Sequence, residues 1–264
     1  MSSLLTGLNP QQTQAVTASP GPTLILAGPG SGKTRVLTQR IAYLVQQGTP
    51  PFRIMAVTFT NKAAREMRER VEKLLGGELG GLTIGTFHSI CARFLRREAD
   101  HVGVTRDFVI FDDSDQLAVV KQAMERLKLD EKQYRPQVLL GAISKAKNEL
   151  ITPAEYRAET YFAEIAGRVY AEYQKLLREN NAFDFDDLLM QVVLLFREHP
   201  DVLARYHHNY DHVLVDEFQD TNTAQYALLK LLTATKRNLY VVGDPDQSVY
   251  RWRGADYRNV RRFQ

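Results

Sequence analysis

Residues 27–34 read Ala-Gly-Pro-Gly-Ser-Gly-Lys-Thr and stand between an apolar run, Thr23–Leu26, and a segment with helical patterning. A glycine-rich turn between a strand and a helix points successive backbone N–H groups inward, at the positive end of the helix. This order is typical of a phosphate-binding loop. A surface loop rich in Gly and Pro is the alternative, and the flanking strand and helix patterns disfavour it. The sequence therefore predicts a P-loop that binds a nucleoside triphosphate.

Each position of this loop has an expected role. Lys33 is predicted to reach the β- and γ-phosphates, and the Thr34 hydroxyl to ligate Mg²⁺. Ala27 replaces the usual first glycine, a change between small residues that leaves the turn intact. The predicted nucleotide-binding loop consists of Ala27, Gly28, Pro29, Gly30, Ser31, Gly32, Lys33 and Thr34.

Two later segments predict the rest of the nucleotide site. An apolar strand, residues 213–215, delivers Asp216 and Glu217 at its end. Asp216 is expected to complete the Mg²⁺ site, and Glu217 to orient and deprotonate the attacking water. Gln247 follows another strand and can hydrogen-bond the γ-phosphate or that water, which makes it a candidate sensor of hydrolysis. A strand that merely runs into an acidic loop is the alternative, and its pairing with the loop at 27–34 disfavours it.

The pattern of apolar runs predicts the fold class. β-rich runs are expected at 23–27, 54–59, 82–86, 212–215 and 239–242, and each is followed by a turn and a helical pattern. Such alternation indicates a parallel sheet covered by helices on both faces. After the second run, Thr60 is expected to cap a helix whose apolar face includes Met67 and Val71 and which ends at Gly76.

The middle of the chain differs. After the short run Phe108–Phe111, Ser114 is expected to open a helix, and further helices are expected near 136–147 and 160–180. The sequence therefore predicts a mostly helical insertion in an α/β host.

Composition excludes several classes of protein. The 264 residues are 44% apolar and 25% charged, as in ordinary globular proteins, and the first residues lack the pattern of a secretory signal. The single cysteine, Cys91, excludes an internal disulfide and suits a reducing compartment. A cytoplasmic location is therefore expected.

The formal charge of +3 does not by itself indicate nucleic acid, but the distribution of basic residues does. Near the end of the chain, arginines alternate with Tyr250, Trp252 and Tyr257. This mixture is typical of surfaces that bind single-stranded nucleic acid.

Taken together, the motifs resemble the UvrD/PcrA/Rep branch of superfamily 1A DNA helicases. The resemblance covers essentially the whole chain and rests on segments in family order. These are residues 8–16, the loop at 27–34, 58–64, 85–89, Asp184-Phe-Asp-Asp-Leu188, Asp216-Glu-Phe-Gln-Asp220 and 247–256.

The resemblance implies a RecA-like P-loop NTPase domain, 1A, at residues 1–107 and 191–264, interrupted by a helical domain, 1B, at 108–190. ATP and Mg²⁺ are the implied cofactors, with Gln12 on the adenine edge and Arg35 against its face. Single-stranded DNA and its junctions with duplex are the implied substrates. The implied DNA contacts are Phe59, Asn61, Tyr250, Trp252 and Arg253. From the residues alone, Phe59 fits core packing better, because it ends an apolar strand.

The resemblance also implies a 3′→5′ helicase or translocase of which this chain is the N-terminal half. Family members continue into a second RecA-like domain that supplies two arginines to the γ-phosphate. We therefore expect weak binding of ATP and Mg²⁺ and slow hydrolysis by this chain alone, with the missing C-terminal domains and repair or replication proteins as partners.

Other classes stay open as alternatives. The chain could be a non-catalytic module that binds nucleotide and single strands, or the motor part of a RecB/AddA-like helicase–nuclease. A P-loop kinase gives no reason for the aromatic and basic residues that accompany the phosphate site. His207, His208 and His212 crowd one segment, but a solvated helix end is the preferred interpretation over a metal site, since no suitably spaced ligands complete a set. Cys91 is expected to be a small buried residue, and a structural role for His88 is at least as well supported as a DNA contact.

Overall fold

The computed structural model describes residues 3–77, 80–244, 259 and 263, and the chain divides into two compact units. Unit 1 consists of Met1–Ile90 together with Phe196–Gln264, and unit 2 of Cys91–Leu195. The boundaries fall inside two helices, α4 (Phe87–Arg97) and α8 (Phe185–Glu198). Unit 2 is thus an insertion in the chain of unit 1.

Unit 1 is built on a five-stranded sheet with the order β1-β7-β6-β2-β3. Its strands are β1 Thr23–Leu26, β2 Ile54–Thr58, β3 Thr83–Thr86, β6 His212–Val215 and β7 Leu239–Gly243. Every neighbouring pair is parallel, which confirms the predicted α/β class with a parallel sheet. Because parallel strands end at a common edge, the loops that follow β1, β2, β6 and β7 gather along that edge.

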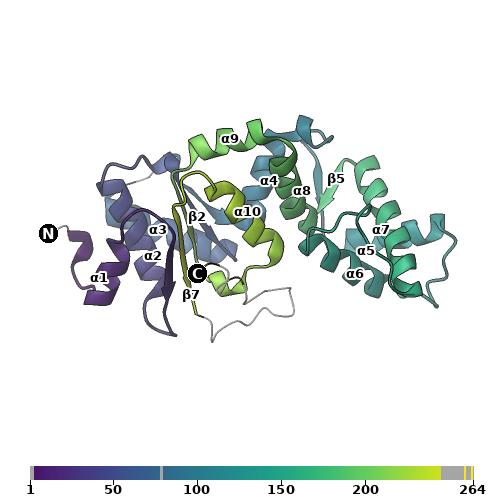
Figure 1. Ribbon diagram of the computed structural model, residues 1–264, viewed down its shortest axis with the longest axis horizontal. Helices are drawn as coiled ribbons and strands as arrows, with labels where there is room; N and C mark the ends of the chain where they lie inside the picture. Colours follow the sequence, from purple (N-terminus) through teal and green to yellow (C-terminus); the bar gives the residue numbers. More distant parts are fainter. Residues whose placement is uncertain (1–2, 78–79, 245–258, 260–262, 264) are drawn as a thin grey trace. The chain divides into compact units, whose positions relative to one another are not determined.

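Helices cover both faces of this sheet, with α2 and α3 on one side and α10 on the other (Figure 1). The helices of unit 1 are α1 Pro10–Val16, α2 Lys33–Gln46, α3 Asn61–Leu75, α9 Pro200–Asn209 and α10 Thr223–Thr233. Short 3-10 turns occur at Ser3–Leu5, Pro51–Arg53 and Phe218–Asp220, the last of which is named η4, and unit 2 contains one at Ala99–His101.

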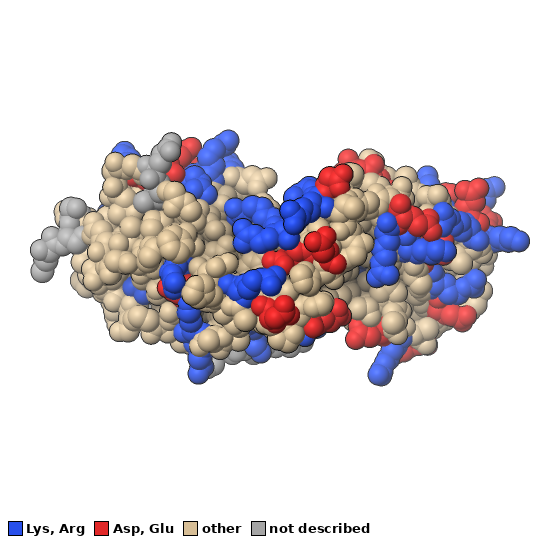
Figure 2. Space-filling model, turned by 90° about the horizontal axis from the view of Figure 1, so that it is seen from above, with Lys and Arg blue, Asp and Glu red and all other residues tan. Residues whose placement is uncertain are grey.

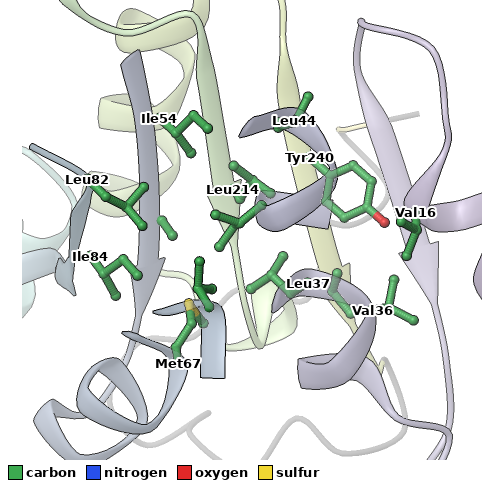
Figure 3. Packing of buried hydrophobic residues seen from close by; sticks show 14 of the residues in the cluster. Val16, Val36, Leu37, Leu44, Ile54, Met67, Leu82, Ile84, Leu214 and Tyr240 are labelled. Carbon is green, nitrogen blue, oxygen red and sulfur yellow. The ribbon is translucent and has the colours of Figure 1, made fainter. Parts of the chain in front are cut away.

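The main core of unit 1 lies between the sheet and the pair α2 and α3 (Figure 3). Leu37 from α2 and Met67 from α3 are fully buried there, against Ile54, Leu214 and Tyr240 from three strands. Burial of each large apolar side chain contributes about 1.5–3 kcal/mol to stability. The central strands β2, β6 and β7 are buried almost throughout, as expected when helices cover both faces.

The helix after β2 forms as its sequence predicts. The Thr60 side chain accepts a hydrogen bond from Ala63 N at the start of α3, and Gly76 ends the helix with a left-handed φ of 78°. Ala64, Met67 and Val71 are buried on its inner face.

Unit 2 is mostly helical, with α5 Asp113–Arg126, α6 Pro136–Asn148 and α7 Tyr161–Glu179 packed around one core. The expected start at Ser114 was wrong by one residue. Asp112 caps α5, because its carboxylate accepts hydrogen bonds from the N–H groups of Ser114 and Asp115. The strand β5 (Ala182–Asp184), which pairs in parallel with β4 (Val109–Phe111), was also not predicted from the sequence. A strand of three residues is too short to show an alternation of apolar and polar side chains.

A buried ion cluster lies in unit 2, where β5 runs into α8. Lys147 is 0% exposed, and its Nζ lies 2.7 Å from Asp184 Oδ2 and 2.9 Å from Asp187 Oδ1. The Tyr173 hydroxyl donates to Asp184, and the Gln174 amide donates to Asp187. Asp184 and Asp187 belong to the Asp184–Leu188 motif, which therefore has a structural role in this unit.

One face of the molecule carries charges of both signs. On the face shown in Figure 2, Lys and Arg are interspersed with Asp and Glu, so this face carries no large surface of one sign. Within the described part of the chain, no helix combines the length and the apolar character needed to cross a membrane.

Candidate nucleotide and nucleic-acid site

The glycine-rich loop joins β1 to α2 and depends on glycine at two described positions. Gly30 and Gly32 have φ of 71° and 87°, in the left-handed region that side-chain-bearing residues rarely adopt. Gly32 is also the N-cap residue of α2, and with no side chain it leaves the first N–H groups of the helix to an external acceptor. The loop therefore has the geometry of an anion site at a helix N-terminus.

Lys33 is the first residue of α2, and its side chain folds back over the loop. The ammonium donates to Ala27 O at 3.1 Å and lies 3.4 Å from Asp244 Oδ2. Asp244 directly follows β7, the neighbour of β1 in the sheet. The lysine is thus held beside the loop, where a phosphate would lie.

Thr34 and Asp216 meet across the sheet edge, and their oxygens fit a magnesium ion. Thr34 Oγ1 lies 3.4 Å from Asp216 Oδ2. Burial, reinforced by the neighbouring Glu217 carboxylate, raises the pKa of Asp216 to about 6. A divalent cation favours the ionised carboxylate, and hydroxyl and carboxylate oxygens are the hard ligands that Mg²⁺ prefers. This pair is the set of residues that would hold Mg²⁺.

Glu217 is half-buried and has an unusual backbone conformation. Its φ of 49° and ψ of 45° are left-handed, which is uncommon for a residue with a side chain. Its N–H donates to Asp216 Oδ1 at 3.1 Å, and its carboxylate accepts from Gln219 Nε2 at 2.8 Å. Residues held in such conformations cluster at functional sites.

The sequence assigned no role to Gln219 or Asp244, although both lie in the site. Gln219 Oε1 accepts a hydrogen bond from Asp244 N at 2.9 Å. Gly243 is one signal for this contact, because a Cβ atom there would lie 2.7 Å from Gln219 Oε1. That signal requires knowing that β6 and β7 are neighbours.

Two residues predicted to contact adenine flank the loop. Gln12, in the first turn of α1, donates from Nε2 to Ser31 O at 2.9 Å, while its Oε1 completes the N-terminal capping box of that helix. Arg35 is exposed on α2, and its guanidinium would lie 3.3 Å from a Cβ atom placed on Gly7. The segment before α1 and the loop are therefore neighbours.

Phe59 and Asn61 lie at the same edge, just after β2. Phe59 is half-buried, and its ring contacts that of Phe87 edge to face, with centroids 5.6 Å apart. Asn61 is exposed at the first turn of α3. Phe59 therefore packs against Phe87 but is not fully buried in the core.

The remaining predicted residues, Gln247, Tyr250, Trp252 and Arg253, lie outside the described residues. Beyond them, Asn259 is buried and donates from Nδ2 to Thr221 O at 2.9 Å. Thr221 directly follows η4, so the chain returns at residue 259 to the turn after Glu217.

His207 and Cys91, for which the sequence favours structural roles, have surroundings that fit such roles. Both ring nitrogens of His207 are used within the protein, against Leu231 O at 2.7 Å and Thr235 Oγ1 at 2.8 Å. Cys91 is fully buried, and burial raises the pKa of its thiol well above its ordinary range.

Comparisons with known proteins agree with this architecture. A family model described as UvrD/REP helicase N-terminal domain matches residues 8–264. The chain is 52% identical over 264 residues to the ATP-dependent DNA helicase PcrA of Bacillus subtilis (strain 168), covering 99% of this chain and 36% of that protein. It is 49% identical over 267 residues to PcrA of Staphylococcus aureus (strain Mu50 / ATCC 700699), covering 100% and 37%.

The chain therefore spans little more than a third of the length of these relatives. The family match covers more than half of the chain and includes the loop at 27–34, Asp216 and Glu217. The chain belongs to the UvrD/REP helicase N-terminal domain family.

Proposed function

We propose that this chain is the ATP-binding part of an ATP-dependent 3′→5′ DNA helicase or single-strand translocase. The observation that carries the proposal is the approach of Thr34 Oγ1 to Asp216 Oδ2, 3.4 Å apart, beside a lysine held over a glycine-rich loop. The similarity to proteins named ATP-dependent DNA helicase PcrA supports the same activity. In this proposal unit 1 is the RecA-like domain 1A and unit 2 is domain 1B.

The proposed hydrolysis assigns one task to each group. Loop N–H groups and Lys33 bind the phosphates, and Gln12 and Arg35 bind the adenine. Thr34 and Asp216 would hold Mg²⁺, which would supply neutralisation of the phosphate charge. Glu217 orients the attacking water and takes its proton, and Gln247 senses the γ-phosphate.

The proposed DNA grip combines Phe59 and Asn61, which lie just after β2, with residues that follow β7 in the sequence. Phe59, Tyr250 and Trp252 would stack on bases, and Asn61 and Arg253 would hold the strand. Stacking contributes about 1–3 kcal/mol per base and is independent of sequence, which a translocating motor requires. The half-burial of Phe59 leaves part of its ring for such a contact.

The proposal also covers turnover and location. Each relative extends far beyond the matched region, and we infer that rapid hydrolysis and unwinding depend on that remainder. An arginine that reaches the γ-phosphate is worth about 10³–10⁵ in turnover, so this chain alone should hydrolyse ATP slowly. Action on DNA implies a cytoplasmic location, with repair or replication proteins as partners.

Two matched variants test the proposal in this chain. Lys33→Ala is expected to abolish binding of a fluorescent ATP analogue and to spare affinity for a fluorescent single strand at low salt. Trp252→Ala should weaken strand binding and leave nucleotide affinity within twofold. Equal loss of both affinities in Lys33→Ala would indicate misfolding, which circular dichroism would reveal.

A complementation assay separates a motor from a binding module. Downstream domains of a PcrA relative, added in trans, should raise ATP hydrolysis in the presence of single-stranded DNA. Tight binding of both ligands with no hydrolysis under any of these conditions would contradict the motor and favour a non-catalytic module.

A further inference from the structure

Gln219 occupies a buried position between two strand ends of the candidate site. Its side chain lies in η4 and the residue is 1% exposed. Nε2 donates to Glu217 Oε2 at 2.8 Å, and Oε1 accepts from Asp244 N at 2.9 Å. A carboxylate can only accept and a backbone N–H can only donate, so these two partners fix the orientation of the amide.

The Glu217 side of this bridge is restrained by its backbone as well. Left-handed φ and ψ at Glu217, together with the hydrogen bond from its N–H to Asp216, set the direction in which its side chain leaves the chain. Glu217 is only half-buried, so part of the residue is open to solvent. The hydrogen bond from Gln219 therefore selects one orientation of a carboxylate that could otherwise rotate.

The Asp244 side of the bridge contacts the phosphate loop. Asp244 is 2% exposed, its carboxylate lies 3.4 Å from Lys33 Nζ, and the carbonyl of Gly243 accepts from Ala27 N at 3.1 Å. A Cβ atom on Gly243 would lie 2.7 Å from Gln219 Oε1, so glycine makes room for the amide. Gln219 thus completes a polar chain from Lys33 through Asp244 to Glu217.

We propose that Gln219 is a positioning residue for Glu217. Its amide holds the Glu217 carboxylate in the orientation that takes a proton from the attacking water. The second hydrogen bond of the amide, from Asp244 N–H, fixes the amide relative to Asp244, which contacts Lys33. The inference rests on the proposed hydrolysis of ATP. Gln219 acts through Glu217 and makes no contact with the phosphates in this scheme.

Two substitutions of Gln219 separate positioning from simple packing. Gln219→Ala removes both hydrogen bonds. Gln219→Glu keeps an acceptor for Asp244 N–H but places a second carboxylate oxygen against Glu217, which repels it. Gln225→Ala is the matched control, because Gln225 is another buried glutamine, and its Oε1 serves the capping box of α10.

The measurements are single-turnover hydrolysis of radiolabelled ATP over hours, the dissociation constant of a fluorescent ATP analogue with Mg²⁺, and amide exchange of Asp244. We expect Gln219→Ala and Gln219→Glu to slow hydrolysis by about 10–100-fold, since general base catalysis contributes about 10²–10⁴-fold. Nucleotide affinity should stay within twofold. Exchange at Asp244 should accelerate in Gln219→Ala and stay slow in Gln219→Glu, and Gln225→Ala should hydrolyse at the parent rate.

A double-mutant cycle provides the decisive comparison. In a Glu217→Gln background, Gln219→Ala should cause no further loss of hydrolysis, because the group it positions is gone. A Gln219→Glu variant with parent activity, equal losses in both backgrounds, or a parallel loss of affinity would overturn the proposal. Failure of the proposed function appears in the parent chain itself, as absent hydrolysis or nucleotide binding, whereas failure of this inference appears only in the variants.

Discussion

Thr34 and Asp216 are separated by 182 positions in the chain, yet their side-chain oxygens lie 3.4 Å apart. Thr34 follows β1 and Asp216 follows β6, and β7 lies between these strands in the sheet. The oxygens meet because all three parallel strands end at one edge. Asp216 is buried beside the carboxylate of Glu217, and keeping both groups ionised there costs stability.

Replacing Asp216 by Asn is therefore expected to stabilise the protein. Burial and Glu217 raise the pKa of Asp216 from 3.8 to about 6. A raised pKa means that the carboxyl supports folding when protonated, below about pH 4, and that this contribution is lost as the pH rises through 6. Each pKa unit corresponds to about 1.4 kcal/mol, so Asp216→Asn should be more stable by up to about 3 kcal/mol at pH 8.

Urea unfolding of both proteins at pH 4.5, 6 and 8 without metal measures this difference, which should shrink toward acidic pH. Mg²⁺ with an ATP analogue should then stabilise the parent and have little effect on Asp216→Asn. If Asp216→Asn were less stable than the parent at pH 8, the prediction that the ionised Asp216 carboxylate destabilises the fold would be wrong.

Removing the cation from the buried cluster of unit 2 is expected to be strongly destabilising. Lys147→Met leaves Asp184 and Asp187 buried without their counter-charge, and breaking such a pair costs about 3–5 kcal/mol. The pKa of Asp187 is already raised to about 6 by burial and by Asp184. The loss should therefore be smaller at pH 5, where Asp187 protonates more readily, than at pH 8.

The control for that substitution is Lys145→Met on the same helix, since Lys145 is exposed. It should change the free energy of unfolding by less than about 0.5 kcal/mol. Equal effects of the two substitutions in denaturant titrations would mean that the ion cluster does not contribute as described.

Two glycines that differ in their surroundings should respond oppositely to alanine. Gly243→Ala would place Cβ 2.7 Å from Gln219 Oε1, whereas a methyl group on Gly141, exposed in α6, would meet no side chain beyond its chain neighbours within 4 Å. Overpacking costs about 1–3 kcal/mol, and alanine in an exposed helix gains about 0.8–1 kcal/mol over glycine. Thermal unfolding of both variants measures whether each is more or less stable than the parent. Unchanged stability of Gly243→Ala would contradict the prediction and show that the end of β7 shifts to accommodate the methyl group at little cost.

The cap of α3 should contribute measurably to stability. Thr60→Ala removes the acceptor for Ala63 N and is expected to cost about 1 kcal/mol, since an N-cap oxygen satisfies a backbone donor of the first turn. Thr60→Ser keeps that oxygen and should retain most of the stability in denaturant unfolding. A serine variant as unstable as the alanine variant would assign the loss to the methyl group instead.

Much of this protein could be predicted from local sequence. The loop at 27–34, the five strands of the main sheet and the capped helix 61–75 follow from period, glycine and capping signals that span a few residues each. Residues Lys33, Thr34, Asp216 and Glu217 were predicted in the same way, because each stands at a fixed offset from the end of a strand.

Only the tertiary structure decided which of these groups meet and what else joins them. The order of the strands placed β7 between β1 and β6, which brought Asp244 to Lys33 and Gln219 to Asp244. The sequence also offered no basis for predicting the pairing of β4 with β5 or the burial of Lys147 against two aspartates, since no local pattern marks either contact. Sequence determines the elements because their signals are local and repeat along the chain, whereas contacts between distant residues depend on how the elements pack.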